Sequence, residues 1–513
     1  MEAVAGGTAD RARTPRPRRL VLATIVIGTA ARLLLAATIG LGVDESYAVT
    51  VARGLSLSYF DHPPLSFWIP GVLARVAGSE SALLLRLPFI ALFAGTTWLT
   101  YRLGARLFGE RAGAWAAVLL NLTPFFALAA GGWILPDGPL DLFLAAAALA
   151  VAHVLFIEPD AHAWRWWLLA GFALGGALLS KYHAVLFGAG LLLFLLTDPG
   201  RRAWLRRPEP YAAAAIALAM FTPVMAWNAQ HDWISFSFQT SRAGAAGGIH
   251  PLALLQNLGG QAGYLLPWIW APLLWLLITG LARGPRDARR WFLCCLAVGP
   301  VALFTLASLK GDPGLPHWPM PGFLMLFPLL GAAVDRGLEI RPAFTRRWLA
   351  FSAIAFSLLA IVAATHAATG WIARAEPEWF TRGDPAYEVL DWRGLRDAAD
   401  ASALFADSAT FVAPVSWVQA AKAAYALGPS VPVLVLNQHP HHYPYLRDPR
   451  TLIGHDAIIV IRADPRADTT ASAYAPYFER IDPLGRIPIT HAGERAFDLF
   501  LFRAHRLLRP YSP

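Results

Sequence analysis

The chain contains a series of apolar stretches that are long enough to cross a lipid bilayer. A helix needs about 20 predominantly apolar residues to span roughly 30 Å of hydrocarbon. Eleven stretches approach this length, and they run from 20 to 41, 82 to 103, 112 to 130, 138 to 157, 164 to 180, 184 to 197, 210 to 227, 262 to 282, 291 to 309, 319 to 334 and 348 to 369. The sequence therefore predicts a polytopic α-helical membrane protein with about 11 to 13 transmembrane helices.

The distribution of charge predicts how these helices are oriented. Only 15% of the 513 residues are charged, and the formal net charge is +9. The basic residues form short clusters between apolar stretches rather than one basic face, so we expect no nucleic-acid partner. With the N-terminus in the cytoplasm, the main arginine clusters lie on the inside, at 102–111, 201–207, 283–290 and 336–347. This matches the rule that cytoplasmic loops carry the excess of Lys and Arg.

The same topology predicts the domain organisation. Residues 1–19 form a basic cytoplasmic N-terminus, and residues 20–370 form the membrane domain with an exterior juxtamembrane loop at 42–80. From residue 371 to 513, short β-branched runs such as "VPVLVLN" and "DAIIVIRAD" alternate with helical periodicity. We expect this part to be a soluble α/β domain on the exterior side.

Two adjacent acids follow the first apolar stretch directly. Asp44 and Glu45 stand where this span meets the exterior surface. One interpretation is that Asp44 only caps a following helix by accepting from its first free N–H groups. Carboxylates at a lipid–water boundary lose hydration unless they are paired or lie in a polar cavity, however, and a cavity explains two of them more simply.

Further polar residues lie on the predicted exterior side. Asp61 and His62 precede a double proline that makes a rigid turn, and Asp137 stands between two prolines in "LPDGPLD". Each of these turns is also compatible with a plain surface role. The cations that accompany these acids are Arg32 inside the first span, Lys181, Arg242, Lys310 and His317. Although each could simply extend towards lipid headgroups, together they indicate an anionic ligand, such as a phosphate on a lipid tail.

The order of these motifs resembles that of bacterial GT-C glycosyltransferases. The motifs are Asp-Glu after the first span, "YFDHPPL", an Asp-Gly-Pro turn, "SKYHAVL" and a late "HWPMPGFLML". The pattern is similar to the aminoarabinose lipid A transferases and to the dolichyl-phosphate-mannose protein mannosyltransferases, and it covers most of residues 20–335. The resemblance implies a GT-C fold in a bacterial inner membrane, with an exterior, periplasmic active site that accepts a polyprenyl-phosphate sugar from the bilayer.

The resemblance also suggests roles for individual residues. Asp44 matches the proposed catalytic carboxylate, whereas Lys181 and Lys310 match basic positions that resemble donor-phosphate contacts. The His-Pro-Pro-Leu pattern of the mannosyltransferases is present at 62–65, but the lipid A enzymes have Glu-Lys before the two prolines. The phosphate-binding role of that Lys is therefore unfilled here, and the divalent metal of some members remains possible without being certain.

The predicted site combines these residues. It contains the catalytic carboxylates Asp44, Glu45 and Asp137, the donor-phosphate ligands Lys181, Lys310, Arg242 and His317, and Asp61 with His62 as contacts to substrate or to a metal. We expect the acids to share one pocket opposite the lysines. The acceptor, which is a lipid, a glycan or a protein, would attack the anomeric carbon with inversion, and a base at Asp44 would contribute about 10²- to 10⁴-fold.

Other interpretations of the chain remain open. Intramembrane charges also occur in lipid-linked sugar transporters and flippases, but the sequence has no repeated halves. A receptor or assembly factor would leave the exterior acids unexplained. A separate motif, "LNQHPHHYPYL", brings His439, His441 and His442 together. It fits a loop that caps the site or meets the acceptor better than a structural zinc site, because no Cys or acidic partner shows the required spacing.

Overall fold

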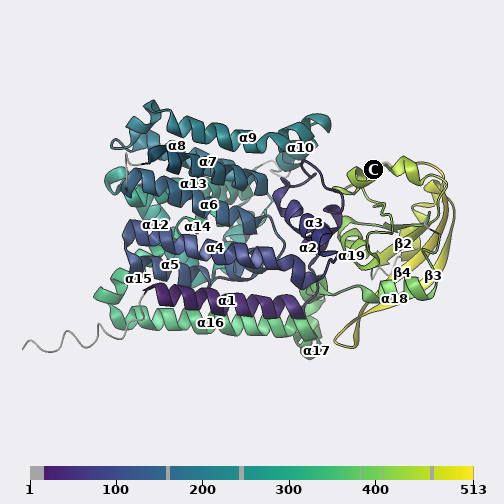
Figure 1. Ribbon diagram of the computed structural model, residues 1–513. Coiled ribbons are helices and arrows are strands. Elements are labelled where there is room, and N and C mark those ends of the chain that lie inside the picture. The colour runs from purple at the N-terminus through teal and green to yellow at the C-terminus, as the bar shows by residue number, and fades with distance from the viewer. Residues whose placement is uncertain are drawn as a thin grey trace, which may run out of the picture. The chain divides into compact units, whose positions relative to one another are not determined.

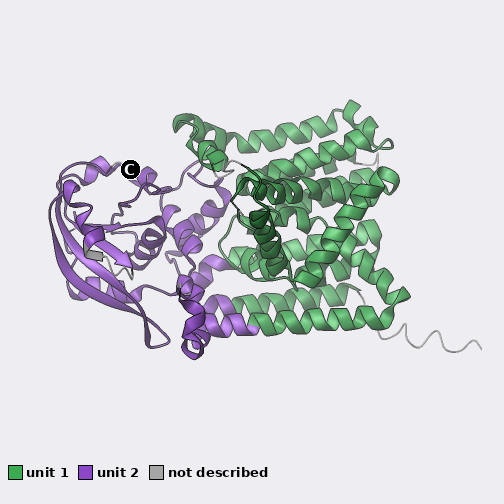
Figure 2. Cartoon of the chain, turned by 180° about the vertical axis from the view of Figure 1, so that it is seen from behind, with its two compact units in different colours: residues 1–33, 87–360 green, residues 34–86, 361–513 purple. Residues whose placement is uncertain are grey.

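The structure is a computed structural model that describes residues 17–157, 162–241, 248–312, 314–381, 383–407, 409–462 and 467–511. The chain divides into two compact units, which Figure 2 shows in different colours. Unit 1 comprises residues 1–33 and 87–360, and unit 2 comprises residues 34–86 and 361–513. Unit 2 thus combines the predicted juxtamembrane loop with the predicted C-terminal domain, a grouping that the sequence did not indicate.

The apolar stretches of the sequence form helices, most of which are labelled in Figure 1. They are α1 (Pro17–Thr38), α4 (Ala82–Phe108), α5 (Glu110–Leu120), α6 (Asp137–Ala152), α7 (Ala163–Ser180), α8 (Val185–Thr197), α9 (Glu209–Gln230), α10 (Ile234–Ser241), α11 (Pro251–Leu265), α12 (Pro267–Arg283), α13 (Ala288–Ala307), α14 (Met320–Leu324), α15 (Phe327–Ile340) and α16 (Pro342–Thr369). Each of the eleven predicted stretches coincides with one or two of these helices.

The described helices confirm a multi-pass membrane protein. Six of them are long and apolar enough to cross a membrane, by length and composition, and the bent pair α11 and α12 brings the number to seven if it forms one span. The pair is bent by 112° where Pro267 begins the second helix. Because several of the predicted stretches form shorter helices, the total of about 11 to 13 spans stays a prediction.

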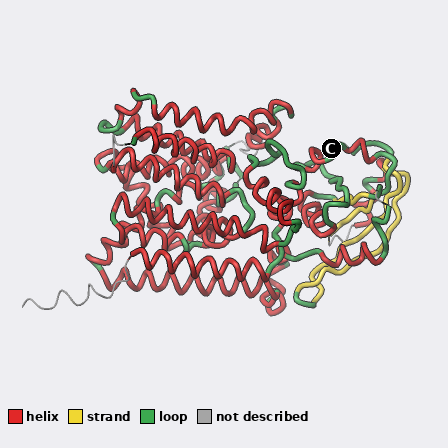
Figure 3. The backbone as a smooth tube through the Cα atoms, in the orientation of Figure 1, coloured by secondary structure: helices red, strands yellow, loops and turns green. Residues whose placement is uncertain are grey.

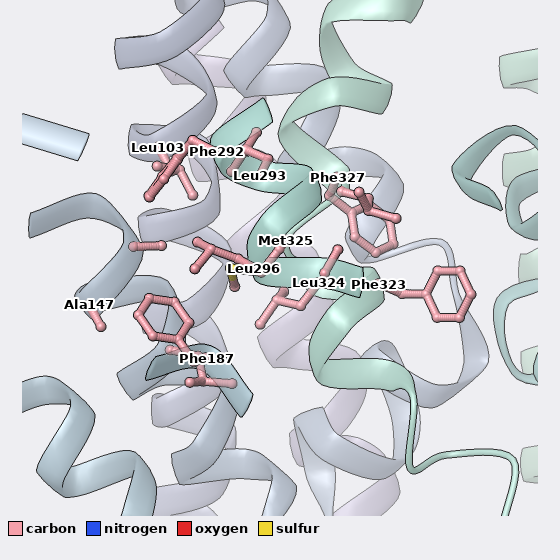
Figure 4. Packing of buried hydrophobic residues seen from close by; sticks show 14 of the residues in the cluster. Leu103, Ala147, Phe187, Phe292, Leu293, Leu296, Phe323, Leu324, Met325 and Phe327 are labelled. Atoms are coloured by element: carbon pink, nitrogen blue, oxygen red, sulfur yellow. The ribbon is translucent and has the colours of Figure 1, made fainter. Parts of the chain in front are cut away.

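Small residues let the helices of unit 1 approach closely. A Cβ atom on Gly331 of α15 would overlap the carbonyl oxygen of Ala112 in α5, and one on Gly171 of α7 would overlap that of Ala213 in α9. Such contacts are typical of membrane helices, whose association depends on close packing rather than on the hydrophobic effect. Figure 4 shows part of the resulting core, in which side chains of α13, α14 and α15 interlock.

Unit 2 contains a small mixed sheet, which appears as the yellow strands of Figure 3. The strands are β1 (Phe411–Pro414), β2 (Ala457–Arg462), β3 (Phe478–His491) and β4 (Glu494–Leu507), in the order β1-β2-β4-β3. β1 and β2 are parallel, and the other pairs are antiparallel. The remaining helices of unit 2 are α2 (Val43–Val51), α3 (Leu65–Ala77), α17 (Trp371–Ala375), α18 (Arg393–Ala401), α19 (Trp417–Leu427), α20 (Tyr443–Leu446) and α21 (Ala467–Ser472). The predicted α/β domain is therefore confirmed.

Strand β2 is buried on both faces. Ile458 and Val460 of β2 belong to one apolar cluster, whereas Ile459 and Ile461 belong to another. The continuous β-branched run "AIIVI" is the sequence pattern expected for such a strand, because successive side chains point to opposite faces.

Candidate active site

The N-terminus of α2 carries the two adjacent acids that the sequence singled out. Gly42 precedes the helix, and its N–H donates to Oε2 of Glu45 at 2.8 Å. This contact satisfies a backbone donor that the helix leaves without an internal partner. The local turn therefore fixes the backbone of Asp44, which lies between these two residues.

A buried arginine holds Glu45 in place. Nε of Arg86 donates to Oε1 of Glu45 at 2.8 Å, and the guanidinium also contacts Oε2. The same guanidinium donates to the carbonyl oxygens of Ile39 and Gly40 at 3.0 and 2.8 Å. Both charged side chains are only 1% exposed. Glu45 thus anchors α2 to the end of α1, and both of its carboxylate oxygens are engaged in doing so.

Asp44 differs sharply from its neighbour. It is exposed, and among the described residues its carboxylate makes no hydrogen bond or ion pair. Desolvation by the surrounding protein raises the pKa of Asp44 to about 6, and the nearby carboxylates of Glu388, Asp61 and Glu45 act in the same direction. The charge of His441 opposes them. Since the side chain is exposed, this desolvation reflects the protein atoms around it rather than complete enclosure. Asp44 is therefore an accessible carboxylate whose pKa suits a general base.

Asp61 belongs to a buried polar network with α2 and the histidine motif. The hydroxyl of Tyr47 donates to Oδ1 of Asp61 at 3.1 Å, and Nδ1 of His441 lies 3.5 Å from Oδ2. The N–H of His442 donates to the Tyr47 hydroxyl at 3.1 Å. Burial alone would raise the pKa of Asp61, but the hydrogen bond with His441 and the nearby imidazoles, including that of His62, lower it to about 2. The network keeps Asp61 ionised.

A lysine that the sequence reasoning missed also supports this region. Nζ of Lys422 in α19 donates to the carbonyl oxygens of Leu41 and Glu388, at 2.6 and 3.1 Å. Lys422 is 4% exposed, and desolvation lowers its pKa to about 8. Its sequence signal is a single cation in the Ala-rich stretch "WVQAAKAAYAL", since a buried charge needs a specific partner.

In unit 1, the structure brings two predicted site residues together. Nζ of Lys181 lies 2.9 and 3.0 Å from the two carboxylate oxygens of Asp137. Both side chains are almost completely buried. Asp141, one turn further along α6, is 1% exposed, and in the described structure neither of its oxygens has a hydrogen-bond partner. The Lys181 cation is thus already oriented by Asp137, with a second carboxylate close by.

The other predicted motifs of unit 1 meet through aromatic contacts. The ring of His183, in "SKYHAVL", lies 6.2 Å from that of Trp318 in "HWPMPGFLML". His317 stacks on Phe125 with ring centroids 6.0 Å apart. Residues that are distant in sequence therefore converge within this unit, as expected for a common site.

The remaining predicted residues are less well defined. Lys310 is exposed at the end of a short 3-10 helix, so its role depends on the motif alone. Arg242 lies outside the described residues. Over the described ranges, no group of three or more His, Cys, Asp and Glu side chains is arranged to hold a metal ion. Asp61, His62 and His441 do not fit a metal site, and no step proposed below uses one. That the acids of unit 2 and the cations of unit 1 share one pocket stays a prediction.

Comparisons with known proteins agree with the motifs. The family model "Dolichyl-phosphate-mannose-protein mannosyltransferase" matches residues 61–227. Two crystal structures of ArnT from Cupriavidus metallidurans share the fold. The apo form has a TM-score of 0.60 at 16% identity, covering 94% of this chain and 97% of ArnT. The form bound to undecaprenyl phosphate has a TM-score of 0.59 at 17% identity, with the same coverage. The chain therefore has the GT-C fold, as the sequence motifs predicted.

Two curated proteins are similar to part of the chain in sequence. The lipid A galacturonosyltransferase RgtD of Rhizobium johnstonii is 26% identical over 267 residues, which cover 52% of this chain and 55% of the relative. The undecaprenyl phosphate-alpha-4-amino-4-deoxy-L-arabinose arabinosyl transferase 1 of Pseudomonas fluorescens is 25% identical over 325 residues, or 60% of this chain and 54% of the relative. The chain thus spans about half the length of these relatives.

Proposed function

We propose that the chain is an inverting glycosyltransferase that moves a sugar from a polyprenyl-phosphate donor to an acceptor at the outer face of the bacterial inner membrane. The acceptor classes that we expect are lipid, glycan and protein, and the two curated relatives favour a lipid such as lipid A. The observation that carries the proposal is Asp44, an accessible carboxylate with a pKa of about 6 at the start of a braced helix.

In the proposed reaction, an acceptor hydroxyl attacks the anomeric carbon of the donor sugar, and polyprenyl phosphate leaves from the opposite face. Asp44 takes the proton of the hydroxyl, because its pKa lies close enough to neutral pH for it to be both ionised and basic. The ion pair between Arg86 and Glu45 supports this role by fixing the backbone on either side of Asp44. We propose that Glu45 is a positioning residue, which holds the backbone of Asp44 in place through its ion pair with Arg86.

The leaving phosphate requires cations, because negative charge develops on it as the bond to the sugar breaks. Lys181 is our first candidate, since Asp137 already orients its ammonium group at 2.9 Å. In this proposal Asp137 is a positioning residue for Lys181. Lys310, His317 and Arg242 remain secondary candidates, supported by their positions in the sequence motifs.

The proposal is tested with the purified full chain in detergent. Lipid A is incubated with undecaprenyl-phosphate-linked 4-amino-4-deoxy-L-arabinose or galacturonic acid, and mass spectrometry follows the addition of one sugar. We expect transfer by the wild type and none by Asp44→Asn. The matched control is Asp482→Asn, an acid on β3 whose side chain is 43% exposed, and it should retain activity. Full activity of Asp44→Asn would remove Asp44 from the mechanism.

The same material separates transfer from transport. In proteoliposomes, a transporter or flippase would move the lipid-linked sugar between leaflets and leave its glycosidic bond intact. A transferase consumes the donor only when an acceptor is present. Movement of the donor with no new product for any acceptor would refute the proposed function.

A further inference from the structure

A cavity of about 720 Å³ lies in unit 1, apart from all the residues discussed so far. Four helix ends line it, because α4 ends at Phe108, α13 begins at Ala288, α15 ends at Ile340 and α16 begins at Pro342. Its walls include the apolar side chains Phe108, Pro272, Leu329, Val334, Phe344 and Trp348. This volume lies in the range of about 300–1,000 Å³ that small-molecule sites occupy.

Three arginines line the same cavity. Arg290 belongs to α13, Arg336 to α15, and Arg341 follows α15 directly. Across the described ranges, none of their guanidinium groups forms a hydrogen bond or an ion pair, and Nε of Arg290 is buried without a partner. The carboxylate that lines the cavity, Asp287, accepts from the backbone N–H of Arg290 at 3.2 Å. Three cations and one anion give the cavity a net positive charge.

The acids of α15 do not neutralise these arginines. Asp335 and Glu339 pair instead with Arg111, at 2.9 and 3.8 Å. Helix α15 thus separates its charges. Its acids face Arg111, whereas Arg336 faces the cavity. The cavity walls therefore combine uncompensated guanidinium groups with an apolar surface.

We propose that this cavity binds the headgroup of an anionic phospholipid. The phosphate would accept hydrogen bonds from the arginines, which suit its geometry, and basic pockets between membrane helices are known to take acidic headgroups. A lipid fits better than a soluble phosphate, because Ile340 and Phe344 on the cavity wall are 64% and 68% exposed. Acyl chains cover such side chains, whereas an inorganic ion leaves them bare.

The test is a lipid titration of the purified full chain, read by native mass spectrometry. The probes are dioctanoyl phosphatidylglycerol, dioctanoyl phosphatidylcholine and inorganic phosphate. We expect phosphatidylglycerol to bind, and Arg336→Gln/Arg341→Gln to weaken that binding about tenfold or more, as loss of hydrogen bonds to a charged phosphate predicts. The matched control is Arg346→Gln/Arg347→Gln, which removes two exposed charges of α16 that do not line the cavity.

The outcomes are distinct. The site is supported if Arg346→Gln/Arg347→Gln binds phosphatidylglycerol with wild-type affinity and Arg336→Gln/Arg341→Gln loses that affinity. Equal loss of affinity in both double variants would indicate a general effect of surface charge and would overturn the proposed site. Equal binding of phosphatidylglycerol and phosphatidylcholine would also overturn it. Competition by inorganic phosphate at concentrations similar to the lipid would assign the cavity to a soluble anion instead. Arg290→Gln gives a second test if the unfolding temperature shows that the double variant is misfolded.

Discussion

The pKa of Asp44 gives the proposed mechanism a pH profile that can be measured. A general base must be ionised, so activity should fall as the pH decreases through its pKa. With a pKa of about 6, about nine-tenths of the Asp44 side chains are ionised at pH 7 and about one-tenth at pH 5. The value of kcat/KM should therefore decrease about tenfold between these pH values. An aspartate with the ordinary pKa of 3.8 would lose almost nothing.

Two neighbouring substitutions should move this profile in opposite directions. The charge of Glu388 raises the pKa of Asp44 and that of His441 lowers it. Glu388→Gln should therefore shift the acid limb of the profile to lower pH, and His441→Gln should shift it to higher pH. The assay is the initial rate of sugar transfer at subsaturating acceptor, which reports kcat/KM, across pH 4.5–8. A limb that stays in place in both variants would show that another group titrates.

Stability provides an independent check on the same residue. The folded-state pKa of Asp44 lies above its unfolded value, so ionisation opposes folding above about pH 6, and this penalty disappears as the pH falls. Asp44→Asn mimics the protonated form. Its unfolding temperature at pH 7 should equal or exceed that of the wild type, even though activity is lost. A clear decrease would assign Asp44 a structural role.

Three further predictions concern a buried ion pair, donor binding and helix packing. Arg86→Met or Glu45→Gln alone should cost about 3–5 kcal/mol of stability, because each leaves a buried group without its partner, and a double-mutant cycle by thermal unfolding should show that the two effects are not additive. Lys310→Ala should weaken binding of the polyprenyl-phosphate donor more than that of the acceptor, and unchanged donor affinity in a titration would refute its assignment. Gly331→Leu should destabilise unit 1 by about 1–3 kcal/mol or more through overlap with backbone, whereas Ala333→Leu on the exposed side of α15 should not.

The membrane fold was predictable because its signal is local. Each apolar stretch reveals a helix by its length, whereas the orientation inferred from the arginine clusters between stretches stays a prediction. The bend at Pro267 and the division into α14 and α15 were not anticipated, because a hydrophobic stretch does not reveal where packing interrupts it. In the C-terminal domain, the run Ile458–Ile461 was correctly predicted as a strand, whereas "VPVLVLN" forms only an isolated bridge at Val433, and β1 and β3 were not anticipated.

The candidate site was only partly predictable. Asp44, Glu45 and Lys181 were identified because charged residues are rare near membrane spans. Their partners were harder to find, since Arg86 and Lys422 act on segments far away in the sequence. Arg86 does leave a signal, as a single cation in "ALLLRLPFIALF". Pairing nevertheless depends on tertiary structure, which no local pattern encodes.

The discontinuity of unit 2 has a consequence for biosynthesis. A ribosome delivers residues 34–86 early, but the groups that hold them in place, such as Lys422, His441 and Tyr443, emerge several hundred residues later. Until that portion has folded, Asp61 lacks the imidazole of His441 beside it and α2 has no helix α19 to pack on. A nascent chain that has not yet delivered these residues would therefore sit in the membrane without an assembled carboxylate cluster, and under the proposed function it would be inactive until they have folded.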